Sequence, residues 1–237
     1  MVGARGSIGL PALSGAAFVA LVTAALFVLP DAVRRPIEDS AQLASALREG
    51  HSAVLAAAFL AGLASACFIW FVGAVRSQLR QAEGETSPLS AVATIGGSAG
   101  AALVLAASAA WTGAATRAAS AGPLVSLAES LLLVASFALA VFGTAASLVL
   151  IETGALSALL GRIGLPIAAL QILAAGCVAA SGPFSPQGAV RTAITLAGLA
   201  WIVALSLACA RQGTPRAPSL PPQRPSPPSR AAVRPPR

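Results

Sequence analysis

Six long apolar stretches, separated by short polar segments, make up most of this chain. They cover about residues 10–30, 52–75, 88–111, 124–151, 163–181 and 192–210. A helix needs roughly 20 predominantly apolar residues to cross the hydrocarbon core of a bilayer, and each stretch has about this length. The pattern therefore predicts an all-α, polytopic membrane protein, a bundle of six transmembrane helices within residues 1–211.

The connection over residues 31–51 is the longest polar segment before the C-terminal tail. Asp39 or Ser40 can cap a short helix inside it. Leu43 and Leu47 lie four residues apart and would form a narrow apolar stripe along that helix. We expect an amphipathic helix that lies on the membrane surface, and a face for docking a partner is the alternative.

The composition agrees with a protein whose solvent is lipid. Hydrophobic residues make up 57% of the chain and charged residues 10%, with a mean hydropathy of +0.82. So few charges cannot cover the surface of an ordinary soluble domain, so the bilayer is the expected partner. All 15 basic residues are arginine and alanine is abundant, which favours a GC-rich bacterial genome and a bacterial cytoplasmic (inner) membrane.

Proline and arginine dominate residues 212–237, which contain no acidic residue. Such a segment cannot form an apolar core, so we expect a disordered cytoplasmic tail with polyproline character. Its arginines can attract anionic lipid headgroups, each by up to about 1 kcal/mol near the surface. Docking of a protein partner on its PxxP spacings and a passive, solvated tail are the alternatives. The net charge of +7 comes largely from this tail, and no basic stripe with interleaved aromatics predicts nucleic-acid binding.

The distribution of arginine predicts the topology. An even number of spans puts both termini on one side of the membrane. A cytoplasmic position for the termini places most of the 15 arginines in the cytoplasm, including those of the tail. The excess of positive charge on the cytoplasmic side of membrane proteins favours this orientation.

The second and third apolar stretches carry recognisable membrane features. Trp70 and Phe71, followed by Arg76 and Arg80, are typical of an interfacial anchor with a cytoplasmic flank. In the third stretch, Gly96 and Gly100 form a GxxxG pair that allows two helix backbones to approach closely. We expect this pair to pack within the bundle, and a homodimer contact is the alternative.

Two polar side chains in the apolar stretches are candidates for function. Glu129 near the start of the fourth stretch marks a proton or ion path if it lies in hydrocarbon. If the span begins near Leu131 instead, Glu129 lies among the headgroups near Arg117. Gln171 in the middle of the fifth stretch either hydrogen-bonds to a neighbouring helix or contacts a substrate, and the first role is favoured.

No constellation for catalysis, cofactor binding or metal binding is present in the sequence. Cys67, Cys177 and Cys209 lie in apolar stretches without a CxxC pair, which is typical of small buried hydrophobes. His51 is the only histidine and has no neighbouring cluster of ligands. The chain contains no HExxH, phosphate-binding or dinucleotide-binding motif.

Two segments resemble a known group of proteins. Residues 68–84, FIWFVGAVRSQLRQAEG, and residues 153–165, TGALSALLGRIGL, are similar to stretches of an uncharacterised multipass membrane protein family common in actinobacteria. With the helix pattern, the resemblance covers about residues 10–211. It implies a bundle of six helices and assigns no activity.

These observations leave two functional hypotheses. The first is a non-enzymatic scaffold, accessory subunit or sensor with a membrane protein partner, because convergent polar groups are lacking. The alternative is a small transporter or lipid-handling protein with a polar site near Glu129 and Gln171. Pro166 in the fifth stretch has no counterpart in the second, which counts against the inverted repeats of many transporters. A membrane enzyme is a distant third.

Overall fold

The structure is a computed structural model that describes residues 10–30, 39–83, 88–176 and 188–212. All regular structure within these ranges is helical. The predictions for the tail over residues 213–237 and for Cys177 lie outside the described residues. The predicted all-α fold is confirmed.

The described helices have the following bounds. The long helices are α1 (Leu10–Val28), α4 (His51–Glu83), α5 (Leu89–Thr116), α6 (Gly122–Thr153), α7 (Ala158–Gly176) and α8 (Ala189–Gln212), and the short ones are α3 (Ser40–Glu49) and the 3₁₀ turn η1 (Ala118–Ser120). Five of them, α4 to α8, are long and apolar enough to cross a membrane. Helix α1 is also apolar but is shorter, and its apolar part covers Leu13–Val28.

Several helices extend past the predicted ends. Helix α4 continues from Val75 to Glu83, because Val75 and Leu79 keep the buried stripe in register and the intervening arginine and glutamine favour helix. Helix α7 begins at Ala158 instead of residue 163. Pro166 therefore lies inside the helix, where it removes one backbone hydrogen bond.

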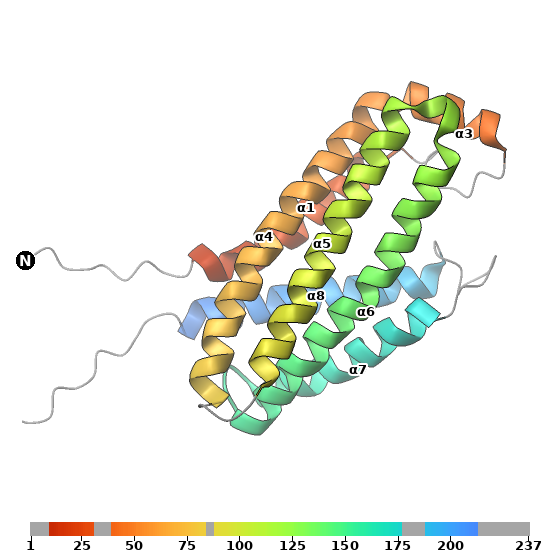
Figure 1. Ribbon diagram of the computed structural model, residues 1–237. Coiled ribbons are helices and arrows are strands. Elements are labelled where there is room, and N and C mark those ends of the chain that lie inside the picture. The colour runs from red at the N-terminus through yellow and green to blue at the C-terminus, as the bar shows by residue number, and fades with distance from the viewer. Residues whose placement is uncertain (1–9, 31–38, 84–87, 177–187, 213–237) are drawn as a thin grey trace, which may run out of the picture.

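The six long helices form a closed ring (Figure 1). Helix α1 packs on α4, α4 on α5, α5 on α6, α6 on α7 and α7 on α8, and α8 returns to α1. Ser206 on α8 fastens the last contact, because its Oγ accepts a hydrogen bond of 3.2 Å from the backbone nitrogen of Ala16. Helices α6 and α8 are not a closely packed pair, which leaves a gap between them.

An aromatic cluster fills the centre of the ring. Phe18, Phe68, Phe71, Phe142 and Trp201 come from four helices, and their ring centroids lie 4.7 to 6.3 Å apart. Tilted and edge-on contacts at such distances add to the energy of apolar burial.

Glycines allow the helices to approach closely. A Cβ atom on Gly96 would lie 2.8 Å from the backbone nitrogen of Phe142, and one on Gly100 would lie 2.9 Å from a methyl carbon of Leu139. Both glycines therefore face α6 across the α5–α6 contact, inside the bundle.

The short helix α3 covers one end of the bundle. Asp39 caps it as predicted, accepting a hydrogen bond of 2.9 Å from the nitrogen of Ala41. The expectation of a stripe facing the membrane is wrong, because Leu43 and Leu47 are buried against Ala114 and neighbouring residues of α5 and η1. We call α3, η1 and the adjoining ends of α4, α5 and α6 the cap.

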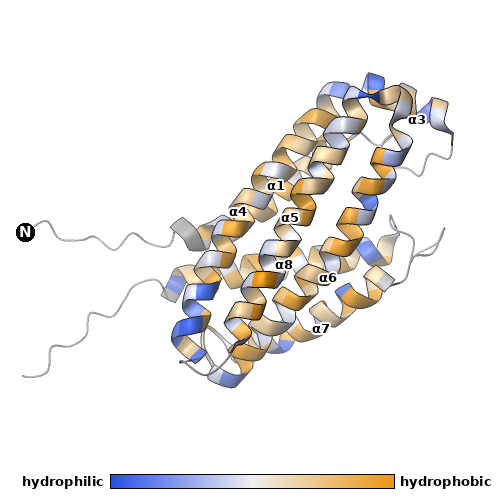
Figure 2. Cartoon of the chain, in the orientation of Figure 1, coloured by the Kyte–Doolittle hydropathy of each residue, from blue (hydrophilic) through white to orange (hydrophobic). Residues whose placement is uncertain are grey.

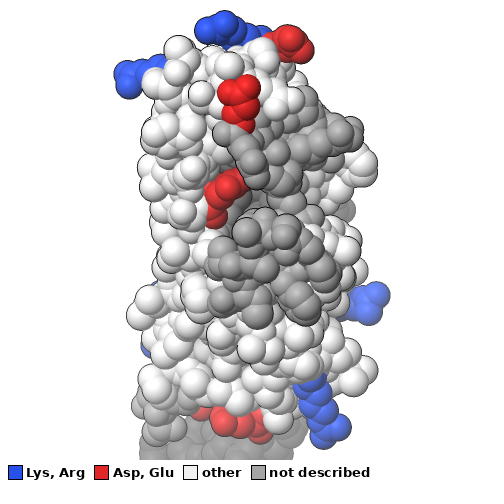
Figure 3. Space-filling model, turned by 90° about the vertical axis from the view of Figure 1, so that its right-hand side faces the viewer, with Lys and Arg blue, Asp and Glu red and all other residues white. Residues whose placement is uncertain are grey.

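The surface of the ring is apolar between its two ends. Figure 2 shows hydrophilic residues at the cap and at the opposite end of α4, with a largely hydrophobic band between them. On the face shown in Figure 3 most of the surface is uncharged, and basic side chains lie at its upper end and lower right. Large exposed side chains such as Phe59 (70% exposed), Trp70 (68%) and Ile95 (69%) are expected where lipid is the solvent.

Candidate functional site

The gap between α6 and α8 continues into a crevice, which we define by its lining from four helices. Its floor is the aromatic centre of the ring, and its sides are α6, α7 and α8, with Phe18 of α1 behind. The lining residues of α8 include Arg191, Thr195, Gly198 and Ile202. They recur at intervals of three or four residues, so they share one face of the helix.

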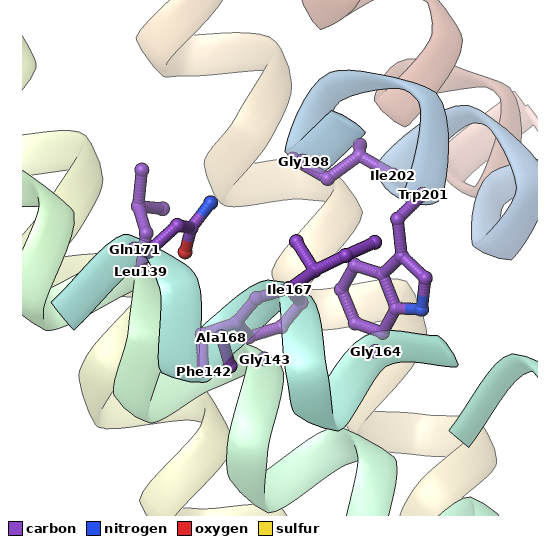
Figure 4. A pocket seen from close by; sticks show the side chains of 10 residues that line it. All are labelled: Leu139, Phe142, Gly143, Gly164, Ile167, Ala168, Gln171, Gly198, Trp201 and Ile202. Atoms are coloured by element: carbon purple, nitrogen blue, oxygen red, sulfur yellow. The ribbon is translucent and has the colours of Figure 1, made fainter. Parts of the chain in front are cut away.

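The crevice holds two cavities with part of their lining in common, and we call the one that Arg191 lines the upper cavity and the other the lower cavity. The upper cavity has a volume of about 80 Å³ and the lower one about 20 Å³, and both are lined by Leu139, Gln171, Gly198 and Ile202. One water needs a cavity of about 10–15 Å³, so the lower cavity has room for a single water and the upper one for several. Figure 4 shows the side chains of α6, α7 and α8 that line the lower cavity.

Glycine and tryptophan fix the floor of the crevice. The indole Nε1 of Trp201 donates a hydrogen bond of 3.0 Å to the carbonyl oxygen of Leu160 and so ties α8 to the start of α7. A Cβ atom on Gly164 would overlap the hydroxyl of Ser147 and would lie 2.8 Å from the indole. Only glycine at this position lets α7 lie so close to both side chains.

Three neutral polar side chains line the upper cavity. Ser136 donates to the carbonyl oxygen of Leu132 at 3.2 Å, and Thr195 donates to that of Arg191 at 2.9 Å. Both hydroxyl oxygens keep the capacity to accept a further bond. The amide of Gln171 packs against Gly198, and no hydrogen bond links it to another described residue. It keeps two donors and an acceptor for a ligand.

Arg191 lines the end of the crevice nearest the start of α8, its mouth, and Glu129 of α6 is the acid whose charge acts on it. The carboxylate of Glu129 on α6 and the guanidinium of Arg191 on α8 interact electrostatically across the gap between the two helices. The expected neighbour of Glu129 was Arg117, at the end of α5. The charge that acts on Glu129 instead comes from α8, because the ring brings the start of α8 beside the upper part of α6.

Of the two candidates from the sequence, Gln171 lines the crevice together with Arg191, and Glu129 interacts with Arg191 from α6. The sequence pattern did not single out Arg191, since this residue precedes the apolar stretch expected to begin at residue 192. The signal that could have identified it is the spacing of Arg191, Thr195 and Gly198, which places all three on one helix face.

The predicted interfacial anchor divides into two parts. Trp70 points outward, and Arg76 and Arg80 are exposed near the end of α4. The assignment of Phe71 to this anchor is wrong. It is fully buried in the aromatic cluster, because the next residue along a helix points about 100° away from Trp70 and here faces the ring centre.

Other reactive groups lie apart from one another. Cys67 and Cys209 are free thiols, and Nδ1 of His51 lies 3.1 Å from the carbonyl oxygen of Ala115, which ties α4 to α5 at the cap. Within the described ranges, no group of three or more His, Cys, Asp and Glu side chains could hold a metal ion. The crevice offers one cation, one anion and neutral hydrogen-bonding groups, which is chemistry suited to binding.

Comparisons with models of protein families, with curated proteins and with solved structures give no match for this chain. The resemblance of residues 68–84 and 153–165 to an actinobacterial family therefore stays a prediction.

Proposed function

We propose that this chain is a non-enzymatic, six-span membrane protein that binds a lipid or another small amphiphile in the crevice among α1, α6, α7 and α8. The observation that carries the proposal is the convergence of Ser136, Gln171, Arg191 and Thr195, from three helices, on one cavity of about 80 Å³. Polar groups are costly in lipid, so their convergence on a cavity favours contact with a ligand.

Six spans follow if α1 crosses the membrane with the other five long helices. The ring supports this, because α1 packs along α4 and α8 as a full member. Both termini then lie on the side of Arg76 and Arg80, and the arginine distribution favours the cytoplasm for that side. The bacterial inner membrane and an Arg-rich tail that contacts anionic headgroups belong to the same proposal.

The experiment compares two phenylalanine substitutions on α7. Ala174 lines the upper cavity, so Ala174→Phe should fill it. The neighbouring Leu173 is 61% exposed and faces away, so Leu173→Phe is the matched control. Native mass spectrometry of gently extracted protein should show a bound lipid or small molecule in the wild type and in Leu173→Phe, and should show none in Ala174→Phe.

A scaffold or accessory subunit is the competing function, and the same measurement distinguishes it. Wild-type protein that carries a stoichiometric protein partner and no small ligand would contradict the binding proposal. Retention of the ligand by Ala174→Phe at the wild-type level would also contradict it, because the ligand would then lie outside the crevice.

A further inference from the structure

The charges at the mouth of the crevice identify the headgroup of its ligand. Arg191 lines the crevice on α8, and Glu129 lies seven residues, about two helical turns, before the lining residue Ser136 on α6. Their charges act on each other across the gap between these two helices, which do not pack closely. The described residues form no direct ion pair between the two side chains, so each charge can still contact a ligand. A site with one acid and one base matches a ligand that carries both charges better than it matches a simple anion.

The depth of the pair in the bilayer indicates a lipid. Helix α8 has no charged residue between Arg191 and Arg211, a distance of about 30 Å along its axis. Helix α6 has none between Glu129 and Glu152, a distance of about 34 Å. Both lengths match the hydrocarbon thickness of roughly 30 Å, so the pair lies at the headgroup level of the leaflet beside the cap.

The crevice changes from polar to apolar with distance from this level. Thr195, four residues beyond Arg191 on α8, is exposed, whereas Leu199 and Ile202 farther along are buried. An amphiphile encounters the same order, with charges first, then ester and hydroxyl oxygens, then hydrocarbon. Gln171 lies where its free amide can reach the ester region.

We propose that the crevice binds an aminophospholipid, with its phosphate on Arg191 and its primary ammonium on Glu129. The planar guanidinium donates two parallel hydrogen bonds to phosphate oxygens. A primary ammonium donates hydrogen bonds to a carboxylate, and a quaternary choline cannot. This inference rests on the proposed function, since it names the ligand of the same crevice.

The experiment offers the purified full chain an equimolar mixture of phosphatidylethanolamine, phosphatidylcholine and phosphatidylglycerol in mixed micelles. Native mass spectrometry then measures which lipid each protein retains. The wild type should retain phosphatidylethanolamine about tenfold better than phosphatidylcholine, the effect of one charge-assisted hydrogen bond. Phosphatidylglycerol, which lacks the ammonium, should also bind more weakly.

Charge-removing variants assign the two contacts. Arg191→Gln should lose binding of all three lipids by about tenfold, and Arg191→Lys should recover part of it because the positive charge returns. Glu129→Gln should bind phosphatidylethanolamine and phosphatidylcholine equally. Arg117→Gln removes a charge from the same end of the bundle, away from the crevice, and should behave as the wild type. Thermal unfolding of each variant checks that it is folded.

The outcomes separate this inference from the proposed function. Equal retention of the three lipids by the wild type, or an unchanged preference in Glu129→Gln, would overturn the aminophospholipid assignment. If Ala174→Phe still loses the bound lipid in that case, the crevice remains the binding site and only the headgroup is wrong. Retention by Ala174→Phe at the wild-type level would overturn both.

Discussion

Two buried serines in neighbouring helices differ in how their hydroxyls are satisfied. Ser65 on α4 donates to the carbonyl oxygen of Ala61 at 3.0 Å. Ser147 on α6 is fully buried, and its Oγ has no hydrogen-bond partner among the described residues. A buried polar group without a partner costs about 1–3 kcal/mol, so the Ser147 hydroxyl lowers stability beside the floor of the crevice.

Replacing this hydroxyl should stabilise the protein. We expect Ser147→Ala to raise the free energy of unfolding by about 1 kcal/mol, because it removes an unsatisfied hydroxyl and leaves a better helix former. The measurement is the unfolding midpoint in detergent. Ser65→Ala is the control and should leave the midpoint unchanged or lower it. A lower midpoint for Ser147→Ala would show that the hydroxyl has a partner, such as a bound water.

At this scale the sequence identified residue types better than residue positions. Glu129 and Gln171 stood out because polar groups are rare in apolar stretches. The partner of Glu129 could not be predicted, since Arg191 is 62 positions away in the chain and only the ring closure brings the two together. Phe71 was misplaced because an evenly apolar helix does not reveal which face is buried.

At the scale of elements, α3 is the clearest departure from a simple bundle. The N-cap of α3 could be predicted from the sequence, because the Asp39 side chain supplies an oxygen that accepts a hydrogen bond from a free backbone N–H group of the first turn. What the apolar stripe of α3 contacts could not be predicted, because the same sequence pattern suits a stripe that faces lipid and one that packs on protein. The structure uses Leu43 and Leu47 to cover the ends of α4 and α5, which fixes the entrance to α4.

Shortening one leucine should loosen the cap without unfolding the ring. Leu47 is fully buried, and truncation of a buried leucine costs about 2–5 kcal/mol. We expect Leu47→Ala to speed backbone hydrogen exchange over residues 40–49 and to leave α4 to α8 unchanged. The exposed Gln42→Ala in the same helix should exchange as the wild type. Equal protection in the two variants would mean that the stripe does not hold α3 in place.

At the scale of the whole molecule, the long apolar helices could be predicted from the length of the apolar stretches, and the order of their neighbours could not. Roughly 20 apolar residues suffice to predict a span, because bilayer thickness sets that length for any helix. Which helices pack together depends on shape, such as the contact of Gly96 and Gly100 with α6. Ring closure through α1 and α8 had no signal in the sequence pattern.

The proposed topology predicts opposite accessibility for two exposed serines. Ser45 lies on α3, and Ser77 lies near the other end of α4. In a chain without native cysteines, a membrane-impermeant maleimide should label Ser45→Cys on intact cells and Ser77→Cys only after lysis. Labelling of both from the same side would contradict a membrane-spanning α4, and the reversed pattern would place the termini outside.

The ring contact between α1 and α8 has a consequence for biosynthesis. These helices are the first and the last of the described chain to leave the ribosome, and the crevice needs both, together with α6 and α7. Before α8 is made, α1 can pack only on α4, and the polar groups of α6 and α7 face the membrane without the polar residues of α8. The proposed binding site therefore assembles in a single late step, and a chain that stops before α8 should insert in the membrane without forming the crevice.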